Sequence, residues 1–363
     1  MAEMDNRYND YTEKIGRWKT AVGLQAVDGL QPSDYLYSLA GKHIEGQIGI
    51  TEVQELLDTY YQQKESRDAG RNTDEADKVA ANIVQVLADN HFSLCADEYR
   101  SIHESLFYNV FSYAGMYRLK NIAKKEWVLK QASVEYGDYR SIEYDLKKAI
   151  QKEADFDYSN LHNTDKIRHF ADFIANIWQI HPFFEGNTRT TAVFAIKYLK
   201  EKEFDVDNEI FRKHSFFFRN ALVRACYENP AENISKDSSY LYQFFENLIL
   251  KTSHKLQNRN MLILPPDNWS HQDSKEKENK IDKKRLTNIG IYKHNNDIYS
   301  IKCFIDDREQ IGKHLKIKDL MEYYKIKETA SEEEKEKFLL DLAERYFKDA
   351  LVIDNKKEIH HKR

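Results

Sequence analysis

The sequence predicts a mainly α-helical fold, and three observations support this prediction. Glycine and proline are scarce in the 363 residues, at 12 and 5 respectively, whereas all-β proteins need many turns. No proline lies between Ser33 and His181, so nothing there interrupts a succession of helices. Apolar residues make up 41% of the chain and aromatic residues 13%, which is enough for a buried core.

Apolar residues recur at helical spacing through most of the first 256 residues. In the stretch 77–87, for example, Val79, Ile83, Val84 and Leu87 fall on one helical face. Helices are expected over residues 11–27, 35–40, 51–61, 77–87, 96–111, 142–154, 166–180, 187–199, 215–227 and 239–256.

The pattern changes at two places along the chain. Residues 125–137 alternate like two short strands, which predicts a β-hairpin among the helices. Residues 272–285 are dense in charge and predict a solvated linker. Beyond them a small α+β module is expected, with strands over 289–293, 298–305 and 310–317 and helices over 320–324 and 331–347.

Charge and cysteine usage exclude several classes of protein. The net charge of −5 gives no electrostatic case for nucleic-acid binding. No apolar run approaches the roughly 20 residues that span a bilayer, and the polar, acidic N-terminus is unlike a signal peptide. The three cysteines, Cys95, Cys226 and Cys303, lie far apart, which favours a reducing cytoplasm. Homo-oligomerisation stays open.

The segment 181–189, with the sequence HPFFEGNTR, brings chemically useful residues together. Gly186 allows a tight turn before a helix, and free amides at a helix N-terminus bind anions. Asn187 and Arg189 add donors suited to phosphate oxygens. Glu185 is a hard oxygen ligand of the kind that holds Mg²⁺ beside phosphates. His181 can accept a proton near pH 7.

This segment resembles the Fic family signature, His-x-Phe-x-(Asp/Glu)-Gly-Asn-x-Arg, at every constrained position. Residues 113–118 and 218–224 also resemble parts of that family's domain. The resemblance implies a helical bundle with a β-hairpin flap. We therefore expect an antitoxin-like N-terminal helical segment, a Fic domain, a charged linker and an accessory α+β module, over residues 1–61, 62–256, 257–287 and 288–363.

The resemblance also implies a reaction, the transfer of AMP from ATP to a Tyr, Thr or Ser hydroxyl of a target protein. His181 would be the catalytic base and Glu185 would hold Mg²⁺. The amides near Gly186 and Asn187 would bind the α-phosphate, and Arg189 would bind the β-phosphate. Two alternatives stay open: a related transferase that uses another nucleotide or phosphocholine as donor, and a nucleotide-binding or interaction protein with weak catalysis.

Two further expectations concern the target protein and the family pattern. The hairpin residues Trp127, Val128 and Leu129 would dock the target along an exposed strand edge. The family signature usually continues to a second arginine that binds the γ-phosphate, and this chain has Ala192 there. Thr188 replaces the commonest glycine of the motif, a change that we expect to be tolerated.

The N-terminal segment resembles the family's inhibitory helix around residues 24–29. Asp28 stands where that helix usually has glutamate, and Glu45 is a second candidate acid. Because Asp28 is one methylene shorter and Ala192 replaces its usual arginine partner, we expect the acid–arginine clamp to be lost from both sides. His169 is expected to be a surface residue and not a metal ligand.

Overall fold

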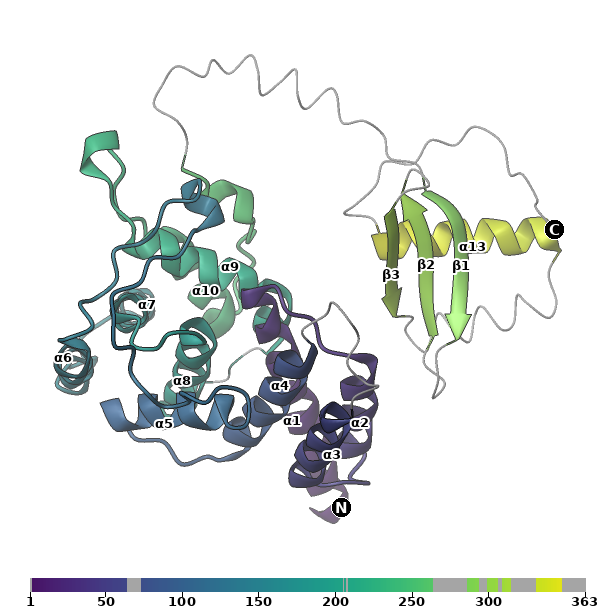
Figure 1. Ribbon diagram of the computed structural model, residues 1–363, viewed down its shortest axis with the longest axis horizontal. Coiled ribbons are helices and arrows are strands. Elements are labelled where there is room, and N and C mark those ends of the chain that lie inside the picture. The colour runs from purple at the N-terminus through teal and green to yellow at the C-terminus, as the bar shows by residue number, and fades with distance from the viewer. Residues whose placement is uncertain are drawn as a thin grey trace. The chain divides into compact units, whose positions relative to one another are not determined.

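The computed structural model describes residues 2–63, 73–204, 206, 208–263, 286–293, 299–305, 309–314 and 331–347. The chain divides into two compact units, residues 1–264 and 265–363, which are drawn in Figure 1.

The first unit is built from helices, as the sequence predicts. Its α-helices are α1 (Ala2–Leu24), α2 (Asp34–Ile44), α3 (Ile50–Gln62), α4 (Thr73–Ala88), α5 (Ala96–Phe107), α6 (Ile142–Ala154), α7 (Asn163–Ile180), α8 (Asn187–Glu201), α9 (Asn208–Cys226) and α10 (Ser239–Leu250). Its short 3₁₀ helices are η1 (Gln25–Asp28), η3 (Trp127–Leu129), η4 (Pro230–Glu232) and η5 (Asn258–Met261).

Helix α8 lies in the middle of this unit, among the other helices (Figure 1). It packs against α4, α5 and α7, and η1 also contacts it. Every residue from Asn187 to Leu199 is buried. Buried polar side chains need hydrogen-bond partners. Because α8 is buried all round, its polar side chains must find these partners in the neighbouring elements.

The N-terminal helices share one hydrophobic core with the rest of the unit. Trp18, Leu24 and Val27 belong to the same buried cluster as the apolar side chains of α7, α8 and α9. Helix α1 lies along α9 and α4. A polar contact adds to this packing, because the buried Asp77 carboxylate of α4 accepts hydrogen bonds from the Ser33 amide at 2.8 Å and the Tyr61 hydroxyl at 2.6 Å.

The β-hairpin predicted over residues 125–137 is not observed. The described residues 119–137 contain no strand, and η3 interrupts them. These residues form a loop whose two ends are joined by backbone hydrogen bonds. The Glu126 amide donates to the Ala132 carbonyl and the Gln131 amide donates to the Glu126 carbonyl, both at 3.0 Å. Two of the apolar side chains in this segment, Val128 and Leu129, are buried in the core, whereas Trp127 is exposed.

The second unit contains the predicted α+β module. Strands β1 (Leu286–Lys293), β2 (Tyr299–Ile305) and β3 (Glu309–His314) form an antiparallel sheet in the order β1-β2-β3. Helix α13 (Glu332–Phe347) contacts β1, and Ile301 and Leu342 are buried. The helix expected at 320–324 and most of the expected linker 257–287 lie outside the described residues.

Among the described residues, no helix is both long enough and apolar enough to cross a membrane.

We expect Gly23→Ala to destabilise the first unit, because α1 and α9 approach closely at this glycine. A Cβ atom at position 23 would lie 2.5 Å from the Arg212 Cα and 2.8 Å from the Phe211 carbonyl oxygen, both of them backbone atoms. Overpacking of this kind costs about 1–3 kcal/mol. Urea unfolding measures the loss. Gly41→Ala is the matched control, because a Cβ at position 41 meets nothing within 4 Å, and equal stability of the two variants would contradict the close packing.

Candidate active site

The chain reverses between α7 and α8 through residues 181–186. His181 caps the end of α7 with φ +51°, and Gly186 precedes α8 with φ +80°. Position 186 needs glycine for a second reason, since a Cβ atom there would overlap the Phe107 ring. The turn opens the first amides of α8 to the loop, and amides in the first turn of a helix have no partner within the helix. The helix N-terminus that the sequence predicts beside Gly186 is therefore present.

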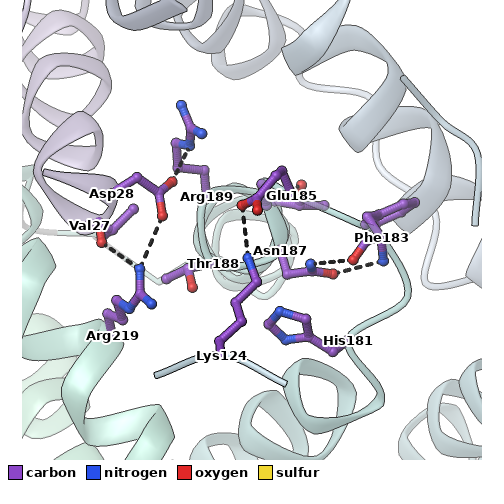
Figure 2. A network of polar contacts seen from close by, with 12 residues as sticks. Val27, Asp28, Lys124, His181, Phe183, Glu185, Asn187, Thr188, Arg189 and Arg219 are labelled. Atoms are coloured by element: carbon purple, nitrogen blue, oxygen red, sulfur yellow. Dashed lines mark hydrogen bonds and ion pairs between the residues drawn. The ribbon is translucent and has the colours of Figure 1, made fainter. Parts of the chain in front are cut away.

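Asn187 holds this loop in shape. Its side-chain oxygen accepts a hydrogen bond from the Phe183 amide at 2.9 Å, and its side-chain nitrogen donates to the Phe183 carbonyl at 2.8 Å (Figure 2). Both ends of the Asn187 side chain are thereby used. The backbone amide of this residue, at the start of α8, is the group that can face an anion.

His103 of α5 also supports the loop, and no motif in the sequence pointed to this residue. Its ring stacks on buried Phe183 at 3.7 Å between centroids. Its Nδ1 accepts from the Gly115 amide at 2.9 Å, so its Nε2 carries the proton and donates to the Glu185 carbonyl at 3.1 Å. Burial lowers the pKa of His103 to about 3, so the ring stays neutral.

His181 has the surroundings of a base. Its side chain is 3% exposed and stacks on Tyr136 at 3.9 Å. Nδ1 lies 3.3 Å from the Trp178 carbonyl, and because a carbonyl only accepts, Nδ1 carries the proton. Nε2 is then the unprotonated nitrogen, and it has no hydrogen-bond partner among the described residues. Burial lowers the pKa of His181 well below its usual value, and Lys124 adds to this effect.

Glu185 faces a cation that sequence reasoning missed. Its carboxylate lies 2.8 Å from Nζ of Lys124, a residue of the loop before η3, and its side chain is 42% exposed. Figure 2 shows Lys124 reaching between Glu185 and His181. No group of three His, Cys, Asp or Glu side chains in the described part of the chain could hold a metal ion. The Glu185 carboxylate, which is 42% exposed, would fit Mg²⁺ only together with phosphate oxygens, since Mg²⁺ is usually held by one or two carboxylates and substrate phosphates.

Arg189 is buried on α8 with 1% of its side chain exposed, and three side chains from earlier in the sequence surround it. Nε pairs with Asp28 at 2.8 Å and an Nη with Glu75 at 2.6 Å. The other Nη donates to the Gln25 side chain at 3.1 Å, and the guanidinium stacks over the Phe107 ring. Two carboxylates thus pair with one buried cation, and an amide oxygen accepts a hydrogen bond from it.

The expectation that Asp28 lacks an arginine partner is wrong. Besides Arg189, Asp28 pairs with Arg219 of α9 at 3.1 Å, and Arg219 also donates to the Val27 carbonyl at 2.8 Å (Figure 2). Arg219 in turn binds buried Glu126 at 3.0 Å. The sequence could not reveal this pairing, because α9 and η1 are distant in the chain and meet only after folding.

The other predicted residues lie away from this network. Trp127 is 45% exposed, whereas Val128 and Leu129 are buried and offer no strand edge to a target. Glu45 is exposed at the end of α2 and accepts a hydrogen bond from Gln47. His169 of α7, 26% exposed, lies 2.9 Å from Glu153.

A comparison with protein-family models identifies the class. Residues 93–199, which include the α7–α8 turn, match the model described as the Fic/DOC family. The chain therefore contains a region that is similar to the Fic domain. Fic domain proteins are generally transferases, which typically move nucleotides or other groups onto proteins.

Several solved Fic domains are similar in structure. The N-terminal Fic domain of Bep8 from Bartonella sp. 1-1C has 16% identity and a TM-score of 0.37, covering 56% of this chain and 87% of its own. BepC from Bartonella tribocorum, solved with AMPPNP, has 18% identity and a TM-score of 0.37, covering 51% and 90%. A Fic family protein from Desulfovibrio desulfuricans G20 has 11% identity and a TM-score of 0.39, covering 77% and 76%. No curated protein matches the chain.

We expect His103 to make the protein less stable as the pH falls. In the unfolded chain His103 takes up a proton below its ordinary pKa of 6.5, whereas in the folded protein it stays neutral down to about pH 3. The unfolded state therefore binds more protons in this window, and stability drops with falling pH. His103→Asn should reduce the loss of unfolding free energy between pH 7 and pH 5 by about 2 kcal/mol.

Urea unfolding of the parent and the variant at both pH values gives this difference. His91→Asn, at an exposed position, is the control. If the two variants lost stability equally between pH 7 and pH 5, the buried neutral state of His103 would be refuted.

Proposed function

We propose that the protein is a Mg²⁺-dependent protein adenylyltransferase, which transfers AMP from ATP to a Tyr, Thr or Ser hydroxyl of a target protein and releases pyrophosphate. The observation that carries this proposal is the α7–α8 turn. It places the unpartnered Nε2 of His181, the carboxylate of Glu185 and the open amides of α8 around one loop.

His181 would take the proton from the acceptor hydroxyl. Its Nδ1–H is directed to the Trp178 carbonyl, which fixes the tautomer that leaves Nε2 as acceptor. The hydroxyl oxygen would then attack the α-phosphorus in line, and the bond to the bridging oxygen of the β-phosphate would break. The lowered pKa of His181 keeps the ring neutral at physiological pH, as a base requires.

The residues after His181 would bind the phosphates. The backbone amides at the start of α8 stabilise charge on the α-phosphate, and Arg189 binds the β-phosphate. Glu185 would hold Mg²⁺, which neutralises phosphate charge when bound. Trp127, whose side chain is exposed, would contact the target protein.

The contacts in the structure fit an inhibited state of such an enzyme. The Asp28 carboxylate forms an ion pair with Arg189, the proposed phosphate ligand. Lys124 forms an ion pair with Glu185, the proposed Mg²⁺ ligand. Because Asp28 belongs to the same chain, tethering supplies an effective concentration in the millimolar range, so weak intrinsic binding suffices to keep the site closed.

Labelled ATP tests the proposed reaction. Incubated with Asp28→Ala and Mg²⁺, ATP labelled at the α-phosphate should mark protein, while ATP labelled at the γ-phosphate should not. Label from the γ-phosphate would indicate a kinase. If neither label appeared on protein and transfer occurred from another nucleotide or from a phosphocholine donor, ATP would not be the donor. ATP binding without any transfer would favour a nucleotide-binding protein.

His181→Ala should lower the rate of transfer by roughly 10²–10⁴, because a general base contributes about that much. Nucleotide affinity should change little, since the base acts on the acceptor hydroxyl. Single-turnover transfer and ATP titration measure the two effects separately. Strongly weakened ATP binding with an unchanged transfer rate would exclude His181 as the base.

Glu185→Gln should raise the Mg²⁺ concentration needed for half-maximal transfer by about tenfold or more, since Mg²⁺ prefers a carboxylate ligand. A Mg²⁺ titration at saturating ATP measures this requirement. Glu135→Gln is the control, because Glu135 lies outside the turn. An unchanged titration in Glu185→Gln would remove Glu185 from the metal site.

Asp28→Ala should increase auto-adenylylation by about tenfold or more, because it removes charged contacts to both Arg189 and Arg219. Glu45→Ala is the matched control, since Glu45 is exposed at the end of α2. Equal rates for Asp28→Ala and the parent would show that the ion pairs do not inhibit.

A further inference from the structure

The Asp28 carboxylate lies between two guanidinium groups that come from different helices. One of its oxygens is 2.8 Å from Nε of Arg189 on α8, and the other is 3.1 Å from an Nη of Arg219 on α9. Figure 2 shows the two arginines converging on this one anion from opposite sides. Guanidinium groups bind carboxylate and phosphate with the same donor geometry, so the pair forms a site for an anion.

Each arginine also keeps a second carboxylate on its far side. Glu75 pairs with Arg189 at 2.6 Å, and Glu126 pairs with Arg219 at 3.0 Å. Glu126 is 3% exposed and Arg219 is 19% exposed. These outer contacts do not involve Asp28, so they would hold both guanidinium groups in place when Asp28 leaves. The site is therefore preorganised for another anion.

We propose that Arg219 is a phosphate-binding residue that contacts the terminal phosphate of the nucleoside triphosphate, at the position now occupied by Asp28. This inference rests on the proposed function, because Arg189 is the neighbouring ligand of the β-phosphate. Arg219 thus supplies from α9 the cation that α8 lacks, since the fully buried Ala192 has no donor.

The assignment makes Asp28 and the end of the triphosphate competitors for the same two arginines. AMP has no phosphate beyond the first and leaves this position empty. Arg219 should therefore matter for ATP, less for ADP and hardly at all for AMP.

Nucleotide titrations of the full chain test the assignment, with Asp28→Ala as the starting variant so that the site is free. Adding Arg219→Gln should weaken ATP binding by about tenfold or more, as expected for a lost charged hydrogen bond. AMP binding should change less than about twofold and so reports that the site remains folded. The ATP affinity of Arg219→Lys should lie between those of the parent and Arg219→Gln, because lysine keeps the charge and lacks the planar guanidinium group.

Arg212→Gln is the matched control on the same helix. Arg212 is 43% exposed and pairs with Glu209, so its loss should leave ATP and AMP binding unchanged. If Arg219→Gln does not fold, the ATP affinity of Arg219→Lys relative to its parent tests the assignment. Equal ATP affinity of the Arg219 variants and their parent would overturn the assignment.

Inorganic tripolyphosphate separates this inference from the proposed function. It carries the phosphates without the nucleoside, and its binding should also weaken in Arg219→Gln. Arg219-dependent binding of tripolyphosphate, with no transfer from ATP, would reject adenylylation and keep the phosphate site. ATP-dependent transfer that Arg219→Gln leaves intact, together with unchanged tripolyphosphate binding, would keep adenylylation and reject Arg219.

Discussion

The buried guanidinium group of Arg189 is the constraint that determines how the N-terminal segment, with Gln25 and Asp28, contacts the candidate site. Arg189 is almost completely withdrawn from solvent within the central helix α8, and a buried charge is costly unless it is paired and hydrogen-bonded. Glu75 and Gln25 accept hydrogen bonds from the guanidinium group, and Asp28 adds an ion pair at 2.8 Å. The N-terminal segment is therefore both part of the core and the source of the anion that the site needs in the absence of a ligand.

This requirement would link the proposed inhibition to the stability of the fold through one set of contacts. The carboxylate of Asp28 neutralises both Arg189 and Arg219, so it can leave at low cost only when another anion replaces it. The packing of α1 against α4 and α9 does not depend on that carboxylate. A ligand can thus exchange with one side chain of η1 while the helices around it stay in place, which favours local rearrangement over release of the whole segment.

His181 and Glu185, the proposed base and metal ligand, are held by a different set of contacts. His181 is kept in one tautomer by the Trp178 carbonyl and covered by Tyr136, and Glu185 is fixed through its backbone by His103. Lys124 touches Glu185 and lowers the pKa of His181. The loop that carries Lys124 and Glu126 therefore meets both the catalytic turn and, through Arg219, the anion site.

The sequence by itself determined the helical class and the resemblance of the segment 181–189 to the Fic signature, because these depend on residues adjacent in the chain. It misjudged residues 125–137, where apolar spacing fits a strand and also a buried loop around η3. Only the tertiary structure decided the partners of Asp28. Arg189 pairs with Asp28 and Glu75, and Arg219 pairs with Asp28 and Glu126. These ion pairs join segments far apart in the sequence, which meet only in the folded chain.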